Sequence, residues 1–184
     1  MDNSRYLNTA RAIMKINTAV YSVEKWITVA FMYSLVLVLF INVLFRFVLF
    51  IPAAWAEELG RYLFVWVVYV GSATAMYKWE HIDINLIDTI IAKASAKKPV
   101  IGEKILGFIK KFAVVSTIAY LVFLVIEYGK YLEQVKRIGL SSMFLGVGLE
   151  VPMSAIYFCS FLMIFHAVCY LLIPEALWRE GEKK

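Results

Sequence analysis

Charged residues are scarce in this 184-residue sequence: they make up 18% of it, against 62% hydrophobic residues. A soluble domain usually has about 25% charged residues, which cover its core with a polar surface. The mean hydropathy of +0.74 points the same way. The shortage of charge excludes an ordinary water-soluble domain and indicates a membrane protein.

Cysteine and histidine are also scarce, with two of each. Cys159 and Cys169 lie ten residues apart in one apolar segment, so a helix would separate them by about 15 Å, beyond the ~7 Å between Cα atoms that a disulfide allows. A bis-histidine haem needs two histidines at similar depth. His166 lies within an apolar run whereas His81 lies at a predicted membrane surface, so we expect His166 to form a hydrogen bond with a neighbouring helix.

Charge is absent from the middle of four long apolar runs, each of which approaches the ~20 residues that a transmembrane helix needs. The sequence therefore predicts an all-α integral membrane protein, a single membrane domain of residues 1–184. A carrier usually needs ionisable groups or broken helices at the bilayer midplane, so this chain is not expected to transport a solute by itself. The predicted spans are about 25–46, 57–78, 110–128 and 151–173.

The basic residues indicate how these spans are oriented. Four spans place both termini on one side, and that side has fourteen Lys and Arg residues against five on the other. Both termini are therefore predicted in the cytoplasm. The net charge of +5 reflects this topology rather than a nucleic-acid partner. A secretory signal peptide is disfavoured, since the first apolar run is too long and Arg46 separates it from the small-residue triplet at 54–56.

The segment between the second and third spans has a helical pattern. Over residues 83–95, apolar side chains share one face and polar side chains the other, which predicts a short amphipathic helix lying in the cytoplasmic interface. Asp83 is suited to cap its first turn, with His81 just before it.

Two carboxylates and an arginine stand at the start of the second span, in the stretch AAWAEELGR. Glu57 and Glu58 are four and three residues before Arg61, so either carboxylate can reach the guanidinium on one helix face. A purely structural account is available, because carboxylates favour the first turn of a helix and Trp55 is an ordinary interfacial anchor. A functional account adds Arg46 across a short loop and predicts a charged docking site.

Asn42, near the end of the first span, has two interpretations. It can form an interhelical hydrogen bond, which we favour, or contact a substrate.

The order of these motifs resembles a known family. The segments NVLFR (42–46), WAEELGR (55–61), FVW (64–66) and HIDI (81–84), with Gly71, are similar to the small membrane subunit, DctQ-like, of tripartite ATP-independent periplasmic (TRAP) transporters. Leu145-Gly146 followed by Pro152 matches a later signature loosely. Lys136 and Arg137 match no motif of the family.

The resemblance implies a scaffold subunit rather than an enzyme. A periplasmic substrate-binding protein would capture an organic acid, and a large membrane subunit in the bacterial inner membrane would carry it inward with sodium. The small subunit would brace the large one and help to dock the binding protein, with no cofactor or metal of its own. The implied docking and scaffold residues are Asn42, Arg46, Trp55, Glu57, Glu58 and Arg61, with His81 and Asp83 at the cytoplasmic interface.

Two other functions remain open from the sequence. The first is a self-sufficient small transporter that works as an oligomer, for which Glu127 is the available carboxylate within a span. The second is a membrane anchor of a redox enzyme.

Overall fold

The structure, a computed structural model, describes residues 2–78 and 99–173. Within these ranges the chain forms α1 (Asp2–Phe47), α2 (Ala54–Lys78), α4 (Pro99–Ile138) and α5 (Glu150–Leu172). All four helices are long and apolar enough to cross a bilayer, which confirms the predicted all-helical class with four membrane-spanning helices. The predicted interfacial helix at 83–95, with His81 and Asp83, lies outside the described residues.

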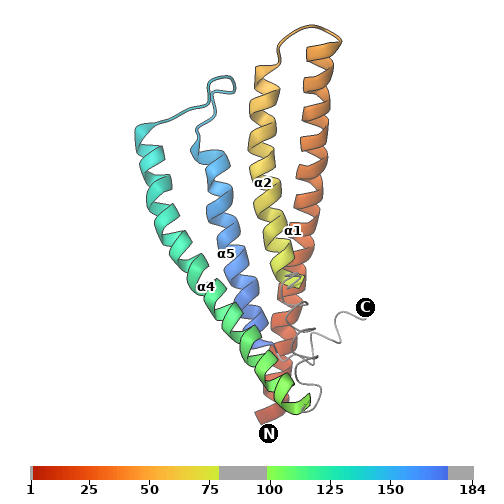
Figure 1. The fold of residues 1–184 in the computed structure, drawn as a ribbon, viewed down its shortest axis with the longest axis vertical. Coiled ribbons are helices and arrows are strands. Elements are labelled where there is room, and N and C mark those ends of the chain that lie inside the picture. The colour runs from red at the N-terminus through yellow and green to blue at the C-terminus, as the bar shows by residue number, and fades with distance from the viewer. Residues whose placement is uncertain (1, 79–98, 174–184) are drawn as a thin grey trace.

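The helices stand side by side in the order α4, α5, α2, α1 (Figure 1). The α1–α2 loop and the α4–α5 loop lie at one end, here called the loop end. The start of α1, the start of α4 and the end of α5 lie at the other, here called the terminal end. A hydrogen bond from the Tyr6 hydroxyl to the Leu172 carbonyl, at 3.4 Å, joins α1 to α5 there.

Two helices are longer than a bilayer requires. The 46 residues of α1 and the 40 residues of α4 rise about 69 and 60 Å, twice the ~30 Å of a hydrocarbon core. The ranges predicted as the first and third spans lie inside these helices. As a result α1 carries polar residues such as Asn17 and Glu24 alongside the other helices before its charge-free run begins.

Small residues allow the helices to approach closely. Ala56, Ala73, Ala155 and Ala167 are fully buried. At Gly60 an added Cβ would lie 3.3 Å from the Leu39 side chain, so α1 and α2 are in contact there. Lipid is as apolar as the side chains, so helices in a membrane associate through this kind of close packing rather than through the hydrophobic effect.

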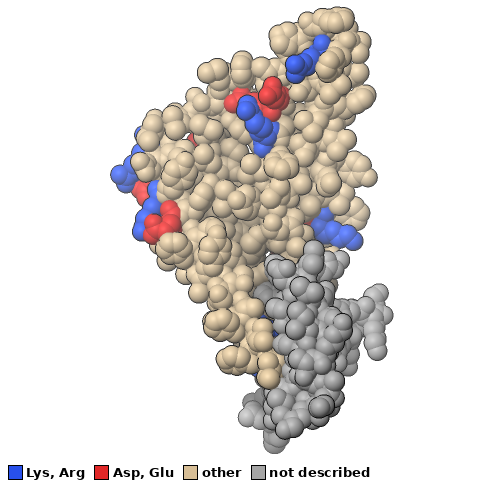
Figure 2. Space-filling model, viewed as in Figure 1, with Lys and Arg blue, Asp and Glu red and all other residues tan. Residues whose placement is uncertain are grey.

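Most of the remaining surface is apolar. No side chain in the most apolar stretch of α1 is buried, and Trp26, Tyr33 and Phe40 on this helix are exposed. Figure 2 shows a few separate groups of charged atoms with uncharged surface between them. A chain with this surface needs lipid or an apolar partner around it.

The α4–α5 loop is a short hairpin. Gly139 ends α4 with φ +69° and Gly146 has φ +64°, backbone conformations that glycine adopts without a steric cost. Across the hairpin the Ser142 amide donates to the Val147 carbonyl at 2.8 Å, and the Leu149 amide donates to the Leu140 carbonyl at 2.9 Å.

Candidate functional site

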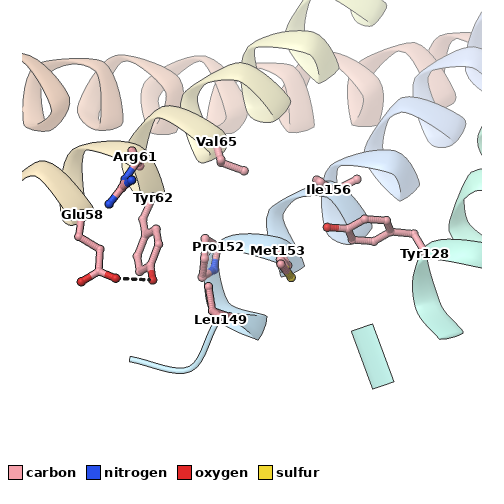
Figure 3. A pocket seen from close by; sticks show the side chains of 9 residues that line it. All are labelled: Glu58, Arg61, Tyr62, Val65, Tyr128, Leu149, Pro152, Met153 and Ile156. Atoms are coloured by element: carbon pink, nitrogen blue, oxygen red, sulfur yellow. Dashed lines mark hydrogen bonds between the residues drawn. The ribbon is translucent and has the colours of Figure 1, made fainter. Parts of the chain in front are cut away.

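Glu58 connects the start of α2 to the α4–α5 loop. Its Oε2 accepts hydrogen bonds from the backbone amides of Phe144 at 3.0 Å and Leu145 at 3.2 Å. Its Oε1 accepts one from the Tyr62 hydroxyl at 3.2 Å, the dashed line in Figure 3. The side chain is 7% exposed. Glu58 therefore fixes the α4–α5 hairpin against α2, because a carboxylate with three donors is a strong anchor for a loop.

The other charges at the loop end are arranged differently from the sequence prediction. Glu57, Arg61 and Arg46 are exposed, and among the described residues neither Glu57 nor Glu58 forms an ion pair with Arg61. The local pairing suggested by helical spacing is wrong. Glu58 instead binds amides 86 and 87 residues away, and the guanidinium of Arg46 lies 5.7 Å from the centre of the Phe47 ring.

Trp55 and Asn42 lie near this end, on α2 and α1 respectively. The Trp55 ring meets Phe45 edge-on, with ring centres 6.4 Å apart, and remains 38% exposed, as suits an interfacial anchor. Asn42 is half-buried. Its side chain has no hydrogen-bond partner within residues 2–78 and 99–173, so the interhelical bond that we favoured is not formed with any described residue.

The sequence prediction missed a buried polar network at the terminal half of the bundle. His166 Nδ1 lies 2.6 Å from Asn17 Oδ1, and His166 Nε2 lies 3.0 and 3.1 Å from the two carboxylate oxygens of Glu24. These three side chains are 1%, 0% and 3% exposed, in the order His166, Asn17, Glu24. The expectation that His166 bonds to a neighbouring helix is met, and the helix is α1.

His166 is held on both sides of its ring, by the side-chain amide of Asn17 and by the carboxylate of Glu24. Burial of a carboxylate is costly without a hydrogen-bonding partner, and His166 is the partner that Glu24 has in the bundle.

Tyr77 of α2 completes the network on a third helix. Its ring stacks on Tyr21 with centres 4.1 Å apart and meets the His166 ring edge-on at 5.7 Å. Its hydroxyl lies 3.0 Å from the Thr18 hydroxyl. The network therefore ties α1, α2 and α5 together at one level. The sequence contained one indication of this network: Asn17 and Glu24 are seven residues apart, which places two polar side chains on the same face of a helix.

The remaining candidates lie at the surface or are buried alone. Glu127 pairs with Lys130 at 2.8 Å, with side chains 51% and 68% exposed, and Arg137 pairs with Glu133 at 2.7 Å. Cys159 and Cys169 are free and buried. In the described part of the chain, no group of three or more His, Cys, Asp or Glu side chains is placed to hold a metal ion.

Four membrane-spanning helices with an apolar surface define a multi-pass membrane protein. The family model for the DctQ component of tripartite ATP-independent periplasmic transporters matches residues 35–173. The match covers most of the sequence, and the chain belongs to this family: it is a small membrane subunit of a TRAP transporter. A comparison with curated proteins gives no match.

Proposed function

We propose that this chain is an immobile brace for the large transport subunit of a bacterial inner-membrane TRAP system. The family places it in a transporter of several subunits. The observation that carries the proposal is α1, a long apolar helix whose most apolar stretch buries no side chain within the chain itself. Such a surface suits contact with a second membrane protein. The buried polar side chains of α1 are bonded to α5, which favours a fixed helix over a moving gate.

Coupled transport then belongs to the large subunit. The described spans hold one buried carboxylate deep in the bundle, Glu24, and it is bonded to His166. We place the sodium sites and the organic-acid site in the large subunit, with no cofactor in this chain. The exposed position of Glu127 on α4, paired with Lys130, gives the self-sufficient oligomeric transporter no support.

A photo-crosslinking experiment tests the bracing role. A benzophenone amino acid at Tyr33 of α1, which is 75% exposed, is expected to crosslink to the large subunit in native membranes. The matched control is Phe123 of α4, 63% exposed. Crosslinks from Phe123 and none from Tyr33 would show that the large subunit contacts α4 rather than α1. No crosslink to the large subunit from either position would remove the bracing role.

Docking of the periplasmic binding protein is the second part of the proposal. The two loops present exposed apolar side chains at one end, with Phe50 at 85% and Met143 at 87% exposure. The exposed charges of Arg46 and Glu57 lie near them on α1 and α2. Apolar contacts surrounded by charge are typical of a protein interface, and Glu58 holds the α4–α5 hairpin in place for it.

Charge reversal tests the docking surface. Arg46→Glu in the assembled membrane complex is expected to weaken binding of the purified binding protein about tenfold, mainly through slower association. Lys130→Glu reverses an exposed cation on α4 and serves as the control, with an expected change below about twofold. Equal effects of the two variants would show that only net charge matters, and the loop end would lose its assigned role.

A further inference from the structure

A groove near the loop end is formed by one face each of α2 and α5. It has a volume of about 500 Å³. Arg61 and Val65 line it from α2, and Met153 and Ile156 line it from α5. Leu149, just before α5, and the Tyr128 ring of α4 complete the lining (Figure 3). The groove stays open because α4 packs on α5 while its loop-end half leans away from the other helices (Figure 1).

The groove combines an apolar floor with a cation at one end. Its α5 wall is aliphatic, whereas Arg61 is exposed and has no ion pair among the described residues. Glu58 also borders the groove, but its oxygens are directed to Tyr62 and the hairpin amides. A ligand that satisfies both parts is an amphiphile with an apolar chain and an anionic head.

The depth of Arg61 fits the phosphate level of a bilayer. Arg61 is seven residues from the start of α2 at Ala54, about 10 Å along the axis. The headgroup region is about 5 to 8 Å thick on each side of the hydrocarbon core. An arginine just inside the start of a spanning helix extends its guanidinium to that region.

The charge at the groove favours a lipid over a helix of another subunit. An apolar helix seated in the groove would leave Arg61, which has no ion pair among the described residues, without a partner. An anionic headgroup would pair with the guanidinium while its acyl chain covers the aliphatic wall.

We propose that this groove binds one phospholipid, with an acyl chain along Leu149, Met153 and Ile156 and the phosphate against Arg61. The lipid would fill the space between α2 and α4 and so hold α4 in its splayed position. The site borders the α4–α5 hairpin through Glu58 and Leu149, and the proposal concerns lipid binding rather than the proposed bracing and docking contacts.

Native mass spectrometry of the full chain tests the proposal. The chain is released from nanodiscs that contain dioleoyl phosphatidylglycerol, and retained lipid is counted per chain. We expect one retained lipid, about tenfold less retention in Arg61→Gln, and recovery in Arg61→Lys, since a bond to a charged group changes binding by at least that factor. Met153→Trp, which fills the groove, is expected to reduce retention without touching the cation. Lys130→Gln is the control and should retain lipid normally.

Three results would overturn the proposal. The first is unchanged retention in both Arg61→Gln and Met153→Trp. The second is an equal loss in Lys130→Gln, which would indicate unspecific attraction to cations. The third is displacement of the lipid by glycerol phosphate, which would show that the head alone binds. The assay needs neither the large subunit nor transport, so its failure is distinct from failure of the proposed function.

Discussion

Removal of His166 is the sharpest test of the buried network. In His166→Leu the Glu24 carboxylate, 3% exposed, loses its partner, and Asn17 Oδ1 loses its donor. Breaking a buried charged pair typically costs about 3 to 5 kcal/mol, because an uncompensated charge remains in the interior. Ordinary hydrogen bonds between membrane helices contribute only about 0.6 kcal/mol. We expect His166→Leu to lower the free energy of unfolding by about 3 kcal/mol or more.

A double-mutant cycle separates this pair from its surroundings. Glu24→Leu leaves His166 Nε2 without an acceptor and should cost about 1 to 3 kcal/mol. The double variant removes both polar groups together, so its cost should fall short of the sum by about 2 kcal/mol. The measurement is unfolding of the purified chain in mixed micelles with SDS, followed by circular dichroism.

The exposed pair Glu127 and Lys130 is the internal control. Its side chains are 51% and 68% exposed, so Lys130→Ala should cost less than about 1 kcal/mol. Single-variant costs that add within about 0.5 kcal/mol, or a His166→Leu cost no larger than that of Lys130→Ala, would refute the assignment of a coupled, buried network.

Two further predictions concern the loop end and the glycines. Glu58→Gln should speed hydrogen exchange at the Phe144 amide about tenfold or more, because a bond to a charged acceptor is weakened. Glu57→Gln, at an exposed position, should leave the exchange rate unchanged. Equal exchange rates in the two variants would contradict the anchoring role of Glu58. Gly139→Ala should lower the free energy of unfolding by about 1 to 2 kcal/mol, because its φ is +69°. Gly107→Ala, within α4 with no atom in its way, should raise it by up to about 1 kcal/mol. Thermal unfolding of both glycine variants checks the opposite signs.

The helical architecture could be predicted from the sequence because a bilayer allows few solutions. Backbone polar groups in lipid must be satisfied within each segment, so long apolar runs become helices. Ala56 and Gly60 are both buried in the structure, as expected of small residues four apart on a membrane helix. Hydropathy could not predict the full lengths of α1 and α4, because their additional turns mix charged residues with apolar ones.

The site residues were harder to predict because their partners are distant in sequence. Helical spacing predicted that Glu58 pairs with Arg61, three residues away. In the structure Glu58 accepts hydrogen bonds from backbone amides 86 and 87 residues away. Backbone amides in a turn leave no signature in residue type. Glu24 lies one residue before the predicted first span, and its partner His166 is 142 residues away, so neither residue indicated the other.

The claim that this chain braces a transporter without moving solute itself is tested most directly by uptake in liposomes. The substrate is first identified as a compound that raises the melting temperature of the binding protein. Uptake of that compound, in radiolabelled form, is then measured under a sodium gradient. We expect uptake when the large subunit, this chain and the binding protein are all present, and none when this chain is the only membrane protein. Uptake by this chain without the large subunit would contradict the account.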